Sequence, residues 1–281
     1  MPEDDPMPTS PTVRRRQLST ELRRLRLESG HTLESAAEAL ETSRGKISHI
    51  ETGRRKKPSM IDINALLDLY GVTDPRQREA VLNLTRQSRE TGWWTRYDDV
   101  FTGAYVGLEA EASRIDTYEP MVVPGLLQTR EYAAEMAEAT LNHRDAQRYV
   151  EARMRRQEIL EREDAPDVWA IMEEASLRRL EPWPDLLFGQ LDRLIQAATV
   201  PGAVTLQLVP MQAGLHPGVA GAFAIMQFAD APTVVYAETL TDGLYVERSE
   251  EIDAYRRAFD HLQGFALSTR ETVSLLRDLK P

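Results

Sequence analysis

The chain has 281 residues, a net charge of −11 and 42% hydrophobic residues, values typical of a globular protein long enough for two domains. It contains no cysteine, which excludes disulfides, cysteine-ligated zinc, iron–sulfur clusters and thiol nucleophiles. The charge is uneven, because residues 13–96 carry a net charge of +6 and residues 97–281 a net charge of −14. Contact with nucleic acid is therefore expected only in the first third of the chain.

The first 12 residues contain four prolines and three acids, a composition that predicts a disordered tail. They lack the basic flank and apolar stretch of a secretory signal, so we expect a cytoplasmic, nucleoid-associated protein. The longest uncharged segment, residues 194–229, is interrupted by prolines, glycines and glutamines. This segment indicates protein core rather than a membrane span, and no membrane association is expected.

Residues 13–91 have the apolar spacing of a series of helices. Five helices are predicted, beginning near Leu18, Thr32, Ser43, Ile63 and Pro75. The hydroxyl side chains at the second and third of these starts are suited to N-caps. Two short helices separated by so few residues predict a helix-turn-helix, in which the second short helix enters the major groove of DNA.

The predicted third helix opens with side chains that can reach base edges. Arg44 can form two parallel hydrogen bonds with guanine, and Gly45 allows a close approach to the duplex. Further contacts with bases or phosphates are predicted for Thr32, Ser43, Lys46, His49, Arg54, Arg55, Lys56 and Lys57. A basic run is more often only a solvated loop, so it is the combination with the helix spacing that predicts double-stranded DNA as the partner. Residues 14–16, all arginine, form either a minor-groove arm or a solvated charge cluster.

Three motifs of this region occur in a recognisable order. They are Gly30-His31-Thr32, the run from Ser43 to Ser48, and Ile50-Glu51-Thr52-Gly53 with basic residues up to Pro58. Through them, residues 22–70 resemble the five-helix DNA-binding domain of the phage-repressor-like Xre family. The resemblance implies a structural ion pair between Arg26 and Glu51. The family's usual glutamine after the opening threonine is Leu33 here, which leaves more of the DNA contact to Arg44, Lys46 and the basic loop.

From residue 92 onward, helical patterns alternate with short β-favouring runs. Helices are predicted at 107–118, 128–140, 143–163, 174–180, 184–199 and 250–278, and strands at 168–172, 204–209, 222–228, 234–238 and 244–247. Three of the strands follow one another without helices between them, which favours an antiparallel arrangement. The predicted fold is mainly α, with a helix-turn-helix domain at 13–91 and an α+β domain with a small, mainly antiparallel sheet at 92–281.

This second part also contains a series of motifs. They are Gly92-Trp93-Trp94, Gly107 to Ala112, Pro124 to Thr129 with Tyr132, Arg156-Gln157, Glu173 to Leu177, Gln207 to Pro210 and His216-Pro217-Gly218. The series resembles the uncharacterised domain that follows a helix-turn-helix in actinobacterial, antitoxin-like transcriptional regulators of the WhiJ type. The resemblance implies a small protein partner encoded nearby.

An aromatic cluster near the domain junction is a candidate sensor pocket. Trp93, Trp94 and Tyr97, with His216 from the glycine-rich loop, can line a site for a small-molecule effector. Aromatic residues with this spacing are more often part of a core, which is the competing interpretation.

Enzymatic chemistry is not expected. The sequence lacks the nucleophile-elbow, phosphate-loop and zinc-protease motifs, and its histidines have no ligand spacing, so no metal and no cofactor is predicted. Glu173 and Glu174 are adjacent and on a helix would point about 100° apart, which does not make a converging acid–base pair. His216 has no identifiable nucleophile or orienting acid and is interpreted as a lone loop histidine.

The sequence therefore predicts a sequence-specific transcriptional regulator, of the repressor type, that binds an operator as a homodimer. Two copies would contact half-sites roughly 34 Å apart. The second domain would dimerise and receive a signal from a small partner protein or a ligand. The alternative is an antitoxin-like interaction module that sequesters a small partner and binds DNA only for autoregulation.

Overall fold

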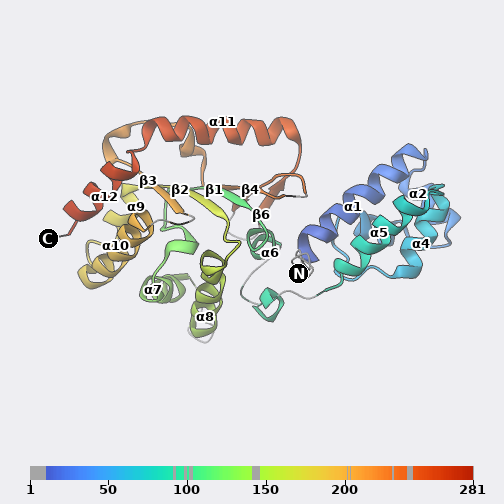
Figure 1. The fold of residues 1–281 in the computed structure, drawn as a ribbon, viewed down its shortest axis with the longest axis horizontal. Helices are drawn as coiled ribbons and strands as arrows, with labels where there is room; N and C mark the ends of the chain where they lie inside the picture. The colour runs from blue at the N-terminus through green and yellow to red at the C-terminus, as the bar shows by residue number, and fades with distance from the viewer. Residues whose placement is uncertain are drawn as a thin grey trace, which may run out of the picture. The chain divides into compact units, whose positions relative to one another are not determined.

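The computed structural model describes residues 11–90, 93–97, 100, 104–140, 146–200, 202, 204–229, 231–238 and 243–280. The chain divides into two compact units, Met1–Thr95 and Arg96–Pro281; Figure 1 shows them and labels most of their helices and strands. Most of the predicted tail lies outside the described residues, but Pro11 and Thr12 are helical, so the predicted tail extends too far.

The first unit contains five α-helices among its described residues. They are α1 (Pro11–Glu28), α2 (Leu33–Ala39), α3 (Arg44–Glu51), α4 (Met60–Leu69) and α5 (Pro75–Gln87). The five predicted helices are confirmed, although α1 begins at Pro11 rather than near Leu18. Proline is tolerated in the first turn of a helix because its missing N–H would have no partner there. The three arginines at 14–16 therefore lie on a helix and not in an extended arm.

The helices of the first unit surround one apolar core. Its buried members come from all five helices and include Leu22 of α1, Ile47 of α3 and Leu66 of α4, each at most 2% exposed. Hydroxyl and carboxylate side chains cap the starts of α2 to α5, and Thr32 forms a reciprocal capping box with Ser35. The core fixes the two short helices α2 and α3 against α1, so the exposed face of α3 has a defined orientation.

The turn between α2 and α3 holds a glutamate in an unfavourable backbone conformation. Glu41 has a φ of 48°, in the left-handed region that costs a residue with a Cβ about 1–2 kcal/mol. We expect Glu41→Gly to raise the free energy of unfolding by about 1 kcal/mol in urea denaturation. Glu38→Gly, at an exposed position within α2, is the control and should lower it by about 1 kcal/mol. Destabilisation by both variants would contradict this account of the turn.

The second unit is built around a six-stranded sheet with the order β3-β2-β1-β4-β5-β6. The strands are β1 (Arg114–Glu119), β2 (Asp167–Glu173), β3 (Val204–Val209), β4 (Phe223–Gln227), β5 (Val234–Glu238) and β6 (Gly243–Val246). β1, β2 and β3 are parallel, whereas β4 pairs antiparallel with β1, β5 with β4 and β6 with β5. The fold class is confirmed, and the sheet is mixed because helical crossovers join the first three strands.

Helices cover both faces of this sheet. They are α6 (Tyr105–Glu109), α7 (Arg130–Thr140), α8 (Ala146–Gln157), α9 (Glu174–Arg178), α10 (Pro184–Thr199), α11 (Ser249–Phe265) and α12 (Thr269–Asp278). In Figure 1, α11 runs along one face and α7, α8 and α10 lie on the other. Between α11 and the sheet lies an apolar core that includes Ile171, Phe223, Phe259 and Leu262.

One predicted helix is wrong. The segment 107–118 divides into the short helix α6 and the strand β1, which lies between β2 and β4. The four residues from Ile115 to Tyr118 are all buried, because both faces of this inner strand are covered. Polar residues, Asp116 and Thr117, stand at buried positions of this strand, so its sequence shows neither the alternation nor the continuous apolar run that identifies a strand.

The predicted helix 250–278 is interrupted by a three-residue break. α11 ends at Phe265, and the backbone N–H of Leu267 donates to the carbonyl of Leu208 at 2.8 Å. α12 then starts with a capping box in which Ser268 and Glu271 bond reciprocally. This serine-x-x-glutamate signal marks a helix start within an otherwise continuous helical pattern.

Candidate nucleic-acid interface

The helix-turn-helix presents the beginning of α3 to solvent. Ser43 is the N-cap, and its hydroxyl accepts from the backbone N–H of Lys46 at 3.2 Å. Ile47 and Ile50 face the core, so the opposite side of α3 carries Arg44, Gly45 and His49. A Cβ built on Gly45 meets no other atom within 4 Å, which leaves open space above the backbone there.

Arg44 is held by a contact that DNA can replace. Its Nε lies 2.5 Å from Oε1 of Glu34 in α2, and the two side chains are 65% and 66% exposed. Ion pairs this exposed contribute little to stability because water screens them. The guanidinium is therefore available to a guanine edge at small cost.

Lys46 has a different environment from Arg44. Its Nζ lies 2.7 Å from Oδ1 of Asp62 in α4, and both side chains are partly buried. The pair links α3 to α4, so the structure brings Arg44, Gly45 and His49 together on the exposed face but directs Lys46 to a carboxylate. The predicted DNA contact by Lys46 would require this ion pair to open.

The basic loop after α3 is exposed and held by the backbone. Arg54 to Lys57 are all exposed, while Pro58 is buried and Ser59 caps α4. Gly53 adopts a φ of 69°, and the N–H of Arg55 donates to the carbonyl of His49 at 3.0 Å. Four consecutive cations next to the end of α3 create a positive potential suited to a phosphate backbone.

Thr32 is the N-cap of α2, and its contact with a phosphate stays a prediction. Its hydroxyl accepts from the N–H of Ser35 at 3.0 Å, and its own N–H donates to the Ser35 hydroxyl at 3.0 Å. Thr32 is exposed, and it caps the start of α2, the helix that carries Glu34. Glu34 is the ion-pair partner of Arg44.

A buried ion pair fixes α1 to the end of α3. Arg26 Nε lies 2.8 Å from Oε1 of Glu51 and its Nη2 lies 2.9 Å from Oε2, with side chains 8% and 4% exposed. The Tyr70 hydroxyl donates to Glu51 at 3.3 Å, and Arg26 also donates to the carbonyl of His31 at 2.9 Å. Hydrogen bonding to Glu51 raises the pKa of Arg26. The pair holds the presenting helix in place and does not itself face DNA.

The candidate sensor residues make the following contacts. Trp93 and Trp94 pack edge to face with ring centroids 6.1 Å apart. Tyr97 lies below the guanidinium of Arg148, which is 5.2 Å from its ring centroid. His216 packs against the rings of Tyr118 and Phe265. A shared pocket for the four residues stays a prediction.

His216 has an acidic neighbour that the sequence does not reveal. Its Nε2 lies 3.1 Å from Oε1 of Glu173, and the Tyr118 hydroxyl donates to the same oxygen at 2.7 Å. Burial, and then this hydrogen bond, raise the pKa of Tyr118. The neighbouring Glu174 accepts instead from the N–H of Met211 at 3.0 Å. The two acids therefore diverge as expected, but the description of His216 as lacking an orienting acid is wrong.

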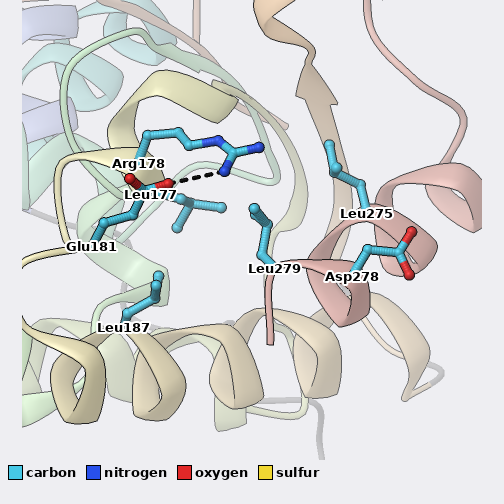
Figure 2. A pocket seen from close by; sticks show the side chains of 7 residues that line it. All are labelled: Leu177, Arg178, Glu181, Leu187, Leu275, Asp278 and Leu279. Atoms are coloured by element: carbon cyan, nitrogen blue, oxygen red, sulfur yellow. Dashed lines mark hydrogen bonds and ion pairs between the residues drawn. The ribbon is translucent and has the colours of Figure 1, made fainter. Parts of the chain in front are cut away.

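A small cavity lies elsewhere in the second unit. Its volume is about 190 Å³, and Figure 2 shows its lining side chains, which come from α9, α10, α12 and the residues after α9 and α12. They are Leu177, Arg178, Glu181, Leu187, Leu275, Asp278 and Leu279. None of the four candidate sensor residues is among them.

The sequence reasoning also missed a buried polar cluster beneath the sheet. Arg156 of α8 donates from Nη2 to Oε1 of Glu109 at 2.6 Å, and the Tyr105 hydroxyl donates to the same oxygen at 3.0 Å. Burial, and then the Glu109 charge, raise the pKa of Tyr105 well above its ordinary value. The cluster ties α8 to α6. Both charged residues stand in motifs singled out above, but only the fold shows that they pair.

Comparison with known families agrees with this division of the chain. Residues 17–81 match the model of a helix-turn-helix domain, and residues 102–278 match that of a domain of unknown function, DUF5753, which covers more than half of the chain. Searches of the curated proteins and of the solved structures found no significant match. The helix-turn-helix match makes this chain a DNA-binding regulator. Of the helices that the structure describes, none combines the length and hydrophobicity needed to span a bilayer.

Proposed function

This chain belongs to the DUF5753 family and carries a helix-turn-helix domain, and from this premise we propose that it is a sequence-specific transcriptional repressor. It acts in the cytoplasm at the nucleoid. It binds a double-stranded operator as a homodimer, so that two copies of α3 contact half-sites roughly 34 Å apart.

The observation that carries this proposal is the exposed face of α3. Arg44 and His49 lie on it with the open backbone of Gly45 between them, and the basic loop from Arg54 to Lys57 follows the same helix. This arrangement supports base contacts by the start of α3 and phosphate contacts by the loop. We assign base recognition chiefly to Arg44 because Lys46 is engaged by Asp62.

The second unit, in this proposal, dimerises and receives a signal. Its net charge of −14 over residues 97–281 keeps its surface away from DNA. The resemblance to WhiJ-type regulators supports a small protein encoded nearby as the source of the signal. The alternative source of the signal is a small-molecule effector that binds to the second unit.

The proposal is tested by comparing Arg44→Ala with Lys56→Ala. Arg44→Ala should weaken binding to the selected operator by about 1–3 kcal/mol and relax the base preference. Lys56→Ala should weaken specific and random DNA about equally and lower the slope of log affinity against log salt by about 1. Fluorescence anisotropy across a salt series, on an operator obtained by selection from random DNA, measures both effects.

Two outcomes would count against these assignments. Equal losses on operator and random DNA for Arg44→Ala would reject base recognition by this residue. Failure of the wild-type protein to select any sequence would reject a sequence-specific regulator altogether.

A further inference from the structure

The proposed dimer requires a surface of the second unit through which two copies can make contact. Residues 97–281 carry a net charge of −14, so the approach of two copies is opposed least where the surface carries no charge. The longest stretch without a charged residue is 194–229. Within this stretch, most residues of β3 and β4 are buried in the sheet. The loop between these two strands carries several large apolar side chains that are exposed.

This loop exposes large apolar side chains. Leu215 is 89% exposed, Val219 69% and Met211 57%. Phe265, at the end of α11, is 38% exposed and its ring centroid lies 5.7 Å from that of His216 in the same loop. In Figure 1 the loop lies beside this end of α11. We call these four side chains the loop patch. Several exposed apolar residues within one short loop mark an interaction site more often than a single one does.

The loop patch is presented on a firmly held backbone. The N–H of Met211 donates to buried Glu174 at 3.0 Å, and His216 contacts the partly buried Glu173 at 3.1 Å. A Cβ built on Gly218 would lie 2.3 Å from the Tyr118 ring, so the backbone lies directly against that ring. Anchors on both sides of Leu215 fix the loop before any partner arrives, which reduces the entropy lost on association.

We infer that the loop patch is the dimerisation surface and that its occupant is the same patch of a second copy of this chain. A twofold interface pairs a surface with itself, so it must be self-complementary. The loop patch can meet this condition, because its own side chains are apolar and three of the four come from the longest stretch without a charged residue. The inference rests on the proposed function, in which two copies bind one operator.

The test measures self-association of the full-length chain. Sedimentation velocity over a concentration series is compared for the wild type, for the double variant Leu215→Asp with Val219→Asp, and for Leu244→Asp. Leu244 is the matched control, since it is 57% exposed on β6 in the same unit but outside the loop. The double variant should raise the dimer dissociation constant about 100-fold or more, whereas the control should leave it within about twofold of wild type. Far-UV circular dichroism at 20 °C should be unchanged, because the substituted side chains are exposed, so a loss of dimer is not a loss of fold.

Cysteine substitution gives a second readout. The natural chain contains no cysteine, so Leu215→Cys, Val219→Cys or Met211→Cys introduces a single thiol on the patch. At least one of these variants should form a disulfide-linked dimer under mild oxidation, because equivalent residues meet near a twofold axis. Leu244→Cys should remain uncrosslinked.

The outcomes separate the inference from the function on which it rests. A double variant that stays dimeric overturns the surface but leaves the dimeric repressor intact. A wild-type chain that is monomeric in solution and on operator DNA overturns the proposed homodimer itself. Loss of a different co-purifying polypeptide from the double variant, with the dimer retained, assigns the patch to that partner and also overturns the inference.

Discussion

Replacement of Glu51 by alanine is expected to lower the free energy of unfolding of the first unit by about 3–5 kcal/mol and to abolish operator binding at 37 °C. The substitution leaves Arg26, 8% exposed, without the carboxylate that accepts its hydrogen bonds. Tyr70 also loses an acceptor. Removing one member of a buried ion pair lowers the free energy of unfolding by this amount because water cannot solvate the remaining charge within the core. Urea denaturation and anisotropy with operator DNA measure the two effects.

The control for this variant uses an exposed ion pair on α1, the helix that carries Arg26. Arg24 pairs with Glu28 at 2.6 Å, but the side chains are 44% and 57% exposed. Glu28→Ala should therefore change stability by less than about 1 kcal/mol. The double variant Arg26→Met with Glu51→Leu should recover much of the lost stability, since an apolar pair needs no hydration. Comparable losses for Glu51→Ala and Glu28→Ala would show that burial does not determine the cost.

A similarly large effect is expected in the second unit, where Glu109→Ala should cost about 3–5 kcal/mol of stability. Arg156 would remain buried without the carboxylate that accepts its hydrogen bonds, although its guanidinium still lies 4.9 Å from the centroid of the Tyr105 ring. The variant should retain binding to a single half-site, because α3 and the basic loop belong to the first unit. Thermal unfolding and anisotropy on a half-site duplex measure these two properties.

Arg155 and Glu158 provide the matched control, because they form an ion pair with side chains 52% and 49% exposed. Glu158→Ala should alter stability by less than about 1 kcal/mol. Loss of half-site binding by Glu109→Ala at a temperature where the first unit remains folded would contradict the separation of DNA binding from the second unit.

The helices of the first unit are predictable because their signals are local. Thr32, Ser43 and Pro75 mark helix starts by side-chain chemistry that acts within three or four residues. The apolar stripe of each helix likewise repeats over a few residues. The exposure of Arg44, Gly45 and His49 follows from the same pattern, since these residues lie outside the apolar stripe of α3.

The contacts that define the site depend on residues far apart in the sequence. Nothing near Lys46 indicates that its charge is taken by Asp62 of another helix. Glu173 and His216 come together because β2 and the loop after β3 meet at one edge of the sheet. The strand β1 escapes detection for a related reason, because its burial on both faces is a property of its neighbours.

The order of strands in the sheet has a consequence for synthesis of the protein. β1 (residues 114–119) pairs with β4 (residues 223–227). This pairing can form only after β4 has left the ribosome, about a hundred residues later in synthesis than β1. The first unit has its own core and needs no residue from that later segment. During translation the DNA-binding helices therefore complete their fold while the sheet is still open. A chain terminated before β4 would retain a module for half-site recognition but lack the completed sheet, and it would compete with the full-length regulator for the operator.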